Sequence, residues 1–243
     1  MRTFALDKSF KTDIMFFTSK MKLSDVLISN HSLVLTLQRF KIELGFGEKT
    51  VAEVCRLNSI DPQFFLLICN VYSDSHYLPT EEEIAHTDMS GLLPYLIASH
   101  NYYLCERIPH IEQHLNRIAD ACKPNHKGIL LRFFGEYKNE VQNHFLYEEK
   151  TVFPYIVSLC DNRKSEGYSI NQFEENHSNI EDKLEDLTNI LIKYLPGDIM
   201  PKERISLLFD LFQLSSDLST HALIEDKILI PYVESLENKT AAQ

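Results

Sequence analysis

The chain contains few of the residues that form tight turns. Only 7 of its 243 residues are glycine. Because glycine readily adopts the positive φ angles that hairpin turns need, this scarcity disfavours a fold built from many short strands. Leu, Ile, Glu, Lys and Gln recur instead in long uninterrupted stretches, and these residues favour helices. The composition therefore predicts an all-α protein, with enough apolar residues to form a sizeable core.

Cysteine is also sparse, and no two cysteines are spaced as Cys-x-x-Cys. The five cysteines are scattered along the chain. This odd, unclustered set argues against a disulfide framework and a zinc ribbon, and it indicates a reducing compartment. The N-terminal stretch lacks an apolar segment of signal-peptide length, and no apolar run is long enough to span a membrane. We therefore expect a cytoplasmic protein with no membrane partner.

Positive charge is in deficit, since the formal net charge is -11. Binding to a phosphate backbone requires clustered Lys and Arg, so no nucleic-acid partner is expected. The first 86 residues carry 9 basic and 11 acidic side chains, which leaves 15 basic and 24 acidic side chains for the rest. The acidity therefore belongs to the C-terminal part of the chain.

Residues 1–86 are predicted to form a small helical domain that ends in a linker. Apolar residues at helical spacing in "SDVLISNHSLVLTLQRFKI" predict one helix, capped by its leading Ser or Asp. Thr50 followed by Glu53 has capping-box spacing, and Asp61 followed by Pro62 is a favoured helix start, so two more helices are expected. The segment "SHYLPTEEE" is polar and contains proline, so it is interpreted as the linker.

Residues 87–243 contain four longer helical stretches joined by short loops. Amphipathic helices of this length and connection predict an antiparallel four-helix bundle. Pro109, Pro154 and Pro231 fall inside three of the stretches and are expected to bend them. The four stretches cover approximately residues 89–121, 129–159, 169–194 and 201–237.

Two segments of the bundle nearly repeat each other. They read "HFLYEEKTVFPY", starting at His144, and "HALIEDKILIPY", starting at His221. Each places a glutamate four residues after the histidine, at Glu148 and Glu225. On a helix, residues four apart point the same way, so each pair presents an imidazole and a carboxylate together. A single pair of this kind is commonly just a hydrogen-bonded surface pair.

A lone histidine precedes each of these pairs at the same interval. His100 lies 44 residues before His144, and His177 lies 44 residues before His221. An antiparallel helix pair with arms of about 20 residues would bring such positions to one level, about 30 Å from the connecting turn. The spacing therefore predicts that four imidazoles and two carboxylates meet at one level of the core.

This donor set predicts a site for metal ions. Two carboxylates in a helical core are costly to bury unless positive charge offsets them, and divalent cations would supply it. Imidazoles with carboxylates suit iron, manganese or zinc, and carboxylates bridge two metals in di-iron bundles. Two octahedral irons joined by a bridging oxide or hydroxide would each keep about one open position for a further ligand.

The same residues give a resemblance to a known family. The "ASHNY", "HFLYEEKTVFP", "ENHSN" and "HALIEDKILIP" segments together resemble the hemerythrin-like HHE cation-binding domain, and more narrowly the RIC family of di-iron proteins. Oxygen-carrying hemerythrins have five histidine ligands, whereas this chain has four in register, so the RIC-type set fits better. The resemblance implies two iron ions held by His100, His144, His177 and His221, with Glu148 and Glu225 as bridging carboxylates.

The N-terminal part resembles the small domain that precedes the bundle in RIC proteins. That family usually carries an adjacent Cys-Cys pair in the glycine-rich turn, where this chain has Gly45 and Phe46 in "LGFGEK". The resemblance therefore does not imply a thiol role for this domain. Cys55 on the following helix is interpreted as a buried apolar residue.

The resemblance implies a role in the repair of iron–sulfur clusters after oxidative or nitrosative damage. Its partners would be damaged iron–sulfur proteins, with NO or O₂ as ligands of the open metal positions. Three alternatives stay open: an O₂, NO or redox sensor or binding module, a di-iron NO reductase or oxidase, and a helical scaffold without metal. Whether the protein is an enzyme, and whether it forms a homodimer, are also left open.

Several other side chains near the motifs receive simpler interpretations. His110 and His114 are four residues apart, but leucines stand 77 residues later, so surface or hydrogen-bonding roles are expected. Glu149, which follows the first predicted bridging carboxylate, either pairs behind a ligand or lies on a solvated face. Tyrosines in these helices, including Tyr103, are interpreted as core packing.

Overall fold

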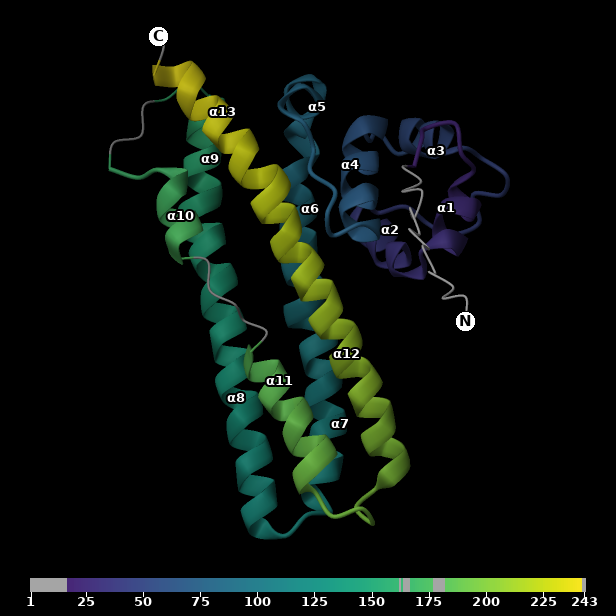
Figure 1. The fold of residues 1–243 in the computed structure, drawn as a ribbon, viewed down its shortest axis with the longest axis vertical. Helices are drawn as coiled ribbons and strands as arrows, with labels where there is room; N and C mark the ends of the chain where they lie inside the picture. The colour runs from purple at the N-terminus through teal and green to yellow at the C-terminus, as the bar shows by residue number, and fades with distance from the viewer. Residues whose placement is uncertain (1–16, 162, 164–166, 177–181, 242–243) are drawn as a thin grey trace, which may run out of the picture.

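The computed structural model describes residues 17–161, 163, 167–176 and 182–241, and this part of the chain is almost entirely helical. Within these residues the single β contact is an antiparallel bridge between Lys22 and Thr50. A small group of short helices packs against the side of a bundle of long rods (Figure 1). The prediction of an all-α helical bundle is confirmed. No described helix is both long enough and apolar enough to cross a membrane.

Four short α-helices and one 3₁₀ helix (His31–Leu33) form the N-terminal unit, which we define as residues 17–73. Asn30 divides the first predicted helix in two, because it adopts an extended conformation and its side-chain oxygen accepts a hydrogen bond from the Ser32 amide at 3.0 Å. The prediction of one helix here was wrong, since this local bond competes with helix continuation. The helices are α1 (Leu23–Ser29), α2 (Val34–Arg39), α3 (Val51–Leu57) and α4 (Pro62–Ser73).

The predicted caps of α3 and α4 are present. Thr50 and Glu53 form a reciprocal capping box, and the Asp61 side chain accepts hydrogen bonds from the first amides of α4. A further helix, α5 (Glu81–His86), begins in the last three residues of the segment expected to be a linker. It begins with a second capping box, in which Thr80 pairs with Glu83. The spacing of these two residues is the same sequence signal that predicted the start of α3.

Three rods of the bundle are made of consecutive helical segments, and the third rod in chain order has two helices on either side of residues 177–181, which lie outside the described part of the chain. The second rod begins at Pro124, about five residues before the expected start, because proline is well tolerated at the first helical position. The rods comprise α6 (Leu92–Asn101) with α7 (Ile108–Asp120), α8 (Pro124–Tyr147) with α9 (Phe153–Cys160), α10 (Ile170–Asn176) with α11 (Asp182–Asn189), and α12 (Pro201–Ile224) with α13 (Ile230–Ala241).

A π-helical turn interrupts the first, second and fourth rods and forms the end of the third rod, and each of the four turns ends two residues before a proline. Proline lacks an amide hydrogen, and its ring crowds the carbonyl four residues earlier. A wider turn relieves this crowding, so Pro109, Pro154 and Pro231 lie in continuous helical rods. π-Helical turns also occur frequently at functional sites. The four turns are Tyr102–Arg107, Glu148–Val152, Ile190–Tyr194 and Glu225–Leu229.

The N-terminal unit shares part of its core with the bundle. Helix α4 places Phe65 and Cys69 in the core of the N-terminal unit, while Phe64 and Ile68 pack with residues from α6, α9 and α13. Cys55 is buried in the former core, as expected for an apolar role. The boundary drawn at residues 86 and 87 from the sequence stays a prediction.

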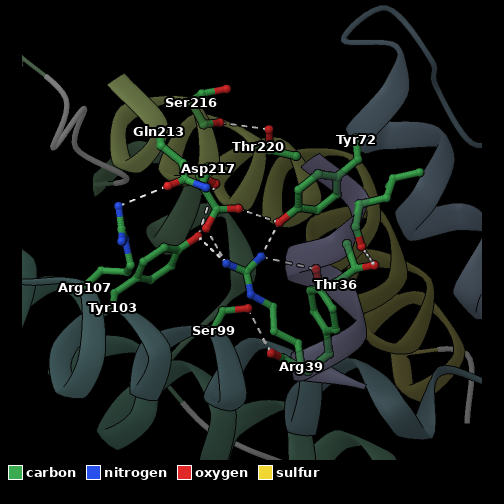
Figure 2. Close-up of polar contacts among 12 residues, drawn as sticks. Thr36, Arg39, Tyr72, Ser99, Tyr103, Arg107, Gln213, Ser216, Asp217 and Thr220 are labelled. Atoms are coloured by element: carbon green, nitrogen blue, oxygen red, sulfur yellow. Dashed lines mark hydrogen bonds and ion pairs between the residues drawn. The ribbon is translucent and has the colours of Figure 1, made fainter. Parts of the chain in front are cut away.

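A buried ion pair also joins the N-terminal unit to the bundle (Figure 2). The guanidinium of Arg39, at the end of α2, contacts the carboxylate of Asp217 on α12. The two side chains are 1% and 3% exposed, so water screens neither charge. The Tyr72 hydroxyl donates to Asp217 Oδ1 at 2.8 Å, and Arg39 Nη2 donates to the Tyr103 hydroxyl at 3.1 Å. Four side chains from four elements therefore form one polar network inside an apolar interface.

We predict that Arg39→Met lowers the free energy of unfolding by about 3–5 kcal/mol, because it leaves the buried Asp217 without its cationic partner. The matched control is Arg107→Met. Arg107 pairs with Asp210, which lies on α12 as Asp217 does. The Arg107 and Asp210 side chains are 15% and 18% exposed. The control should lose on the order of 1 kcal/mol. Urea denaturation measures both values, and equal losses would contradict the prediction.

Candidate metal centre

Four predicted ligands converge inside the bundle. His100 lies near the end of α6 and His221 near the end of α12, while Glu148 and Glu225 are the first residues of two π-helical turns. All four residues are at most 2% exposed. One donor atom from each lies within 4.8 Å of the donor atoms of the others. Three rods therefore place two imidazoles and two carboxylates around one point.

Glu148 lies between two imidazoles. Its Oε2 atom is 3.0 Å from Nε2 of His100, and its Oε1 atom is 2.7 Å from Nε2 of His144. In the second motif, Nε2 of His221 is 3.2 Å from Oε1 of Glu225. Two donor atoms bound about 2.1 Å from one octahedral ion, at right angles, are about 3.0 Å apart. The His100–Glu148 and His221–Glu225 distances are therefore close to those of shared metal ligands.

Several donor atoms in this cluster are buried without a hydrogen bond of regular geometry. Among the described residues they include Nε2 of His100, both carboxylate oxygens of Glu148 and both ring nitrogens of His221. Buried polar groups in proteins are nearly always hydrogen-bonded, because leaving one unsatisfied costs about 1–3 kcal/mol. A cluster in which one donor atom of each residue lies within 4.8 Å of the others, and in which such atoms lack regular hydrogen bonds, fits the requirements of a metal ion.

The electrostatics of the cluster favour a charged carboxylate. Burial and the neighbouring Glu225 raise the pKa of Glu148, but the contacts from His100 and His144 outweigh them and hold it below its usual value. For His100, burial lowers the pKa, but Glu148 and Glu225 outweigh it and leave the value raised. A metal ion would therefore meet a carboxylate that ionises more readily than usual, and it would compete with a proton for His100.

A second carboxylate supports His100 from behind. Oε1 of Glu149 lies 2.8 Å from Nδ1 of His100, on the opposite side of the ring from Glu148. A partner on Nδ1 fixes the orientation of a ligating imidazole and increases its basicity. Of the two interpretations of Glu149 left open by the sequence, the structure therefore favours pairing behind a ligand.

Aromatic rings enclose the two buried imidazoles. Phe145 stacks on His100, with ring centroids 4.0 Å apart and planes 9° apart, and Phe153 packs against the same imidazole at 5.6 Å. Tyr103 and Phe145 each approach His221 edge-on at 5.7 Å. Sequence reasoning missed both phenylalanines. Their signal was adjacency to the motif, because Phe145 directly follows the first motif histidine.

The structure describes one of the other two predicted ligands, His144, but not the other, His177. His144 is partly buried and reaches the centre through its contact with Glu148. His177 lies outside the described residues. The five described donors are three imidazoles and two carboxylates, a set that suits iron, manganese or zinc. The assignment of all six residues as ligands stays a prediction.

A second group of histidines has a different electrostatic environment. Nε2 of His110 and Nδ1 of His114 lie 3.4 and 3.5 Å from Oδ2 of Asp210. Arg107 donates to the other carboxylate oxygen at 3.1 Å, so a protein cation already offsets this negative charge. His110 is also exposed to solvent. The exposed position of His110 agrees with the surface role expected for it, whereas Nδ1 of His114 is buried without a hydrogen bond of regular geometry.

We predict that binding of a divalent metal stabilises the protein through the buried carboxylates. Ferrous iron added anaerobically at about 100 times its dissociation constant should raise the free energy of unfolding by about 2.7 kcal/mol. The double variant Glu148→Ala, Glu225→Ala should lose this increase.

The matched control is Glu112→Ala, which removes a partly exposed carboxylate that pairs with Lys138 between α7 and α8. This variant should keep the full iron-dependent increase. Thermal and urea unfolding with and without iron measure the effect. An equal increase in the double variant would show that the metal binds elsewhere.

Comparison with known families agrees with this geometry. The model of the hemerythrin HHE cation-binding domain matches residues 93–233, which are 141 of the 243 residues and include all six predicted ligands. Comparison with curated proteins and with solved structures gave no match. The matched segment begins in α6 and ends in α13, so it covers all four rods of the bundle. The chain belongs to the hemerythrin HHE cation-binding family.

Proposed function

We propose that this protein holds a di-iron centre and supplies iron for the repair of iron–sulfur clusters damaged by oxidative or nitrosative stress. The observation that carries the metal centre is the position of Glu148, fully buried and within 3.0 Å of two imidazoles. The repair role rests on the resemblance of the motifs to the RIC family. Its partners would be damaged iron–sulfur proteins.

The contacts of Glu148 support two ions rather than one. Its two oxygens face different histidines, with Oε2 toward His100 and Oε1 toward His144. A carboxylate between separate nitrogen donors suits a bridge between two metals. Glu225 would be the second bridge, and His221 and the predicted ligand His177 would supply the remaining nitrogens.

The outer carboxylate supports a centre that can release its metal. Glu149 is 41% exposed at its side chain, yet it contacts Nδ1 of the buried His100. It thus accepts the Nδ1 proton of the imidazole and leaves Nε2, which faces Glu148, as the atom that would bind either a metal or a proton. Because a ligating imidazole must lose its proton to bind, protonation would favour metal release. The centre would therefore lose iron more readily as the pH falls.

We predict that the anaerobically loaded protein binds two ferrous ions per chain. Glu148→Gln should bind fewer, because a neutral amide is a poor bridge between two cations. Gln142→Ala on α8 is a suitable control, since Gln142 is exposed, and it should still bind two. Metal analysis after gel filtration measures the stoichiometry. One ion per wild-type chain would contradict a dinuclear centre.

The repair role predicts transfer of iron to a damaged cluster. The iron-loaded protein should restore the activity of a cluster enzyme inactivated by NO, and the double variant Glu148→Ala, Glu225→Ala should not. The control is an equal amount of free ferrous iron with the same reductant. Recovery no greater than with free iron would contradict iron donation.

A sensor or binding module for O₂, NO or redox state is the second candidate. It is favoured by the buried pair of Arg39 and Asp217, which joins the N-terminal unit to α12 one turn before His221. Fast, reversible spectral changes with NO or O₂, without loss of iron, would support this function. Repeated turnover of NO or O₂ in the presence of a reductant would instead indicate a reductase or oxidase.

A further inference from the structure

The network of Arg39 lies beside the metal centre and not only at the junction of two units. Asp217, which pairs with the guanidinium, is four residues before His221 on α12. Residues four apart on a helix lie on the same face, one turn apart. Arg39 and Asp217 are 178 residues apart in the chain, so the N-terminal unit reaches the ligand-bearing helix through a long-range contact.

Tyr103 connects the ion pair to the imidazole of His221. Its hydroxyl accepts a hydrogen bond from Nη2 of Arg39 at 3.1 Å and donates one to the backbone oxygen of Asp217 at 3.1 Å. The ring of Tyr103 stands nearly perpendicular to His221, with centroids 5.7 Å apart. Figure 2 shows the Tyr103 hydroxyl beside Arg39 and Asp217. Because its ring also packs against His221, this fully buried side chain contacts both the guanidinium and a predicted ligand.

The guanidinium also lies close to the π system of this connecting ring. Its central carbon is 5.2 Å from the ring centroid of Tyr103 and 5.4 Å from that of Tyr102. Such contacts are stronger when the cation is removed from water, and the Arg39 side chain is 1% exposed. Movement or loss of the guanidinium would thus alter both the packing around the Tyr103 ring and the electrostatic field at that ring.

We propose that Arg39 is a positioning residue for the metal centre. Through Tyr103 and Asp217 it holds the His221 imidazole and the helical turn that carries it, so the N-terminal unit controls the geometry of a metal ligand. This inference rests on the proposed metal centre, which it deepens by naming how the N-terminal unit would regulate it. The coupling is reciprocal, since a change at His221 would also alter the hold of the bundle on the N-terminal unit.

The bundle offers a matched comparison for this ion pair. Asp210 lies one heptad before Asp217 on α12, and its partner Arg107 lies on the rod of α6 and α7. This pair joins two rods of the bundle, farther along α12 from His221. It therefore reports the general effect of removing an Arg–Asp pair from α12.

The principal test replaces each charged pair by neutral hydrogen-bonding side chains. The double variant Arg39→Gln, Asp217→Asn should bind ferrous iron about tenfold more weakly, as is typical when the groups supporting a ligand are removed. Its iron-loaded optical spectrum should also shift. The control double variant Arg107→Gln, Asp210→Asn should keep the wild-type affinity and spectrum. Equal affinities and identical spectra in the two double variants would overturn the proposal.

A milder variant provides the test if the first one does not fold. Tyr103→Phe keeps the ring beside His221 but removes the hydroxyl that joins it to Arg39 and Asp217. It should weaken iron binding and shift the spectrum in the same direction. Tyr102→Phe, a neighbouring phenol whose ring also faces Arg39, is the control and should change neither. An unchanged Tyr103→Phe protein would count against the proposal.

A measurement on the metal-free protein separates this inference from the proposed function. The ring resonances of His221 can be observed by NMR in isotopically labelled protein and assigned with His221→Gln. They should shift in Arg39→Gln, Asp217→Asn and in Tyr103→Phe, but not in the Arg107 and Asp210 control. If the wild type binds no iron, the metal centre is wrong, and these shifts still decide whether Arg39 positions His221. Unchanged His221 resonances would overturn the positioning role.

Discussion

The burial of Glu148 and Glu225 in the same part of the bundle is the constraint on which the rest of the site depends. Two carboxylates removed from water at short range repel each other and lose their hydration, so they require positive charge nearby. Short contacts with His100, His144 and His221 surround them. The imidazoles of His100 and His144 hold the pKa of Glu148 below its usual value, and imidazoles are also good metal ligands. The packing of the helices therefore favours a cation at this place.

The negative charges of the carboxylates along the α12 rod are offset by different groups. Asp210 pairs with Arg107 near the surface, and Asp217 pairs with Arg39 in the interior. Farther along the same rod, His221 at four residues and Glu225 at eight residues beyond Asp217 face the cluster around Glu148. The same helix thus passes from carboxylates neutralised by arginines to one surrounded by metal-binding groups. The N-terminal unit supplies the arginine nearest to that transition, which links its docking to the environment of the centre.

Local sequence signals predicted the helices well where the competing interactions were also local. The capping boxes and the Asp-Pro start located α3 and α4, and the repeated motif fell on helices as expected. The errors in the predicted helix boundaries also have simple local causes. Asn30 ends a helix through its own side-chain hydrogen bond, and Pro124 starts one where a break was expected. At the three internal prolines, a widened turn allows the rods to continue, which periodicity alone does not reveal.

The sequence by itself determined the donor types and their register. Equal intervals between His100 and His144 and between His177 and His221 require only regular helices of similar length. Tertiary structure decided which nitrogen faces which oxygen, that Glu149 supports His100, and that Phe145 covers it. It also decided the pairing of two charges 178 residues apart. These features depend on the rotation and separation of packed helices, and spacing along the chain does not specify either one.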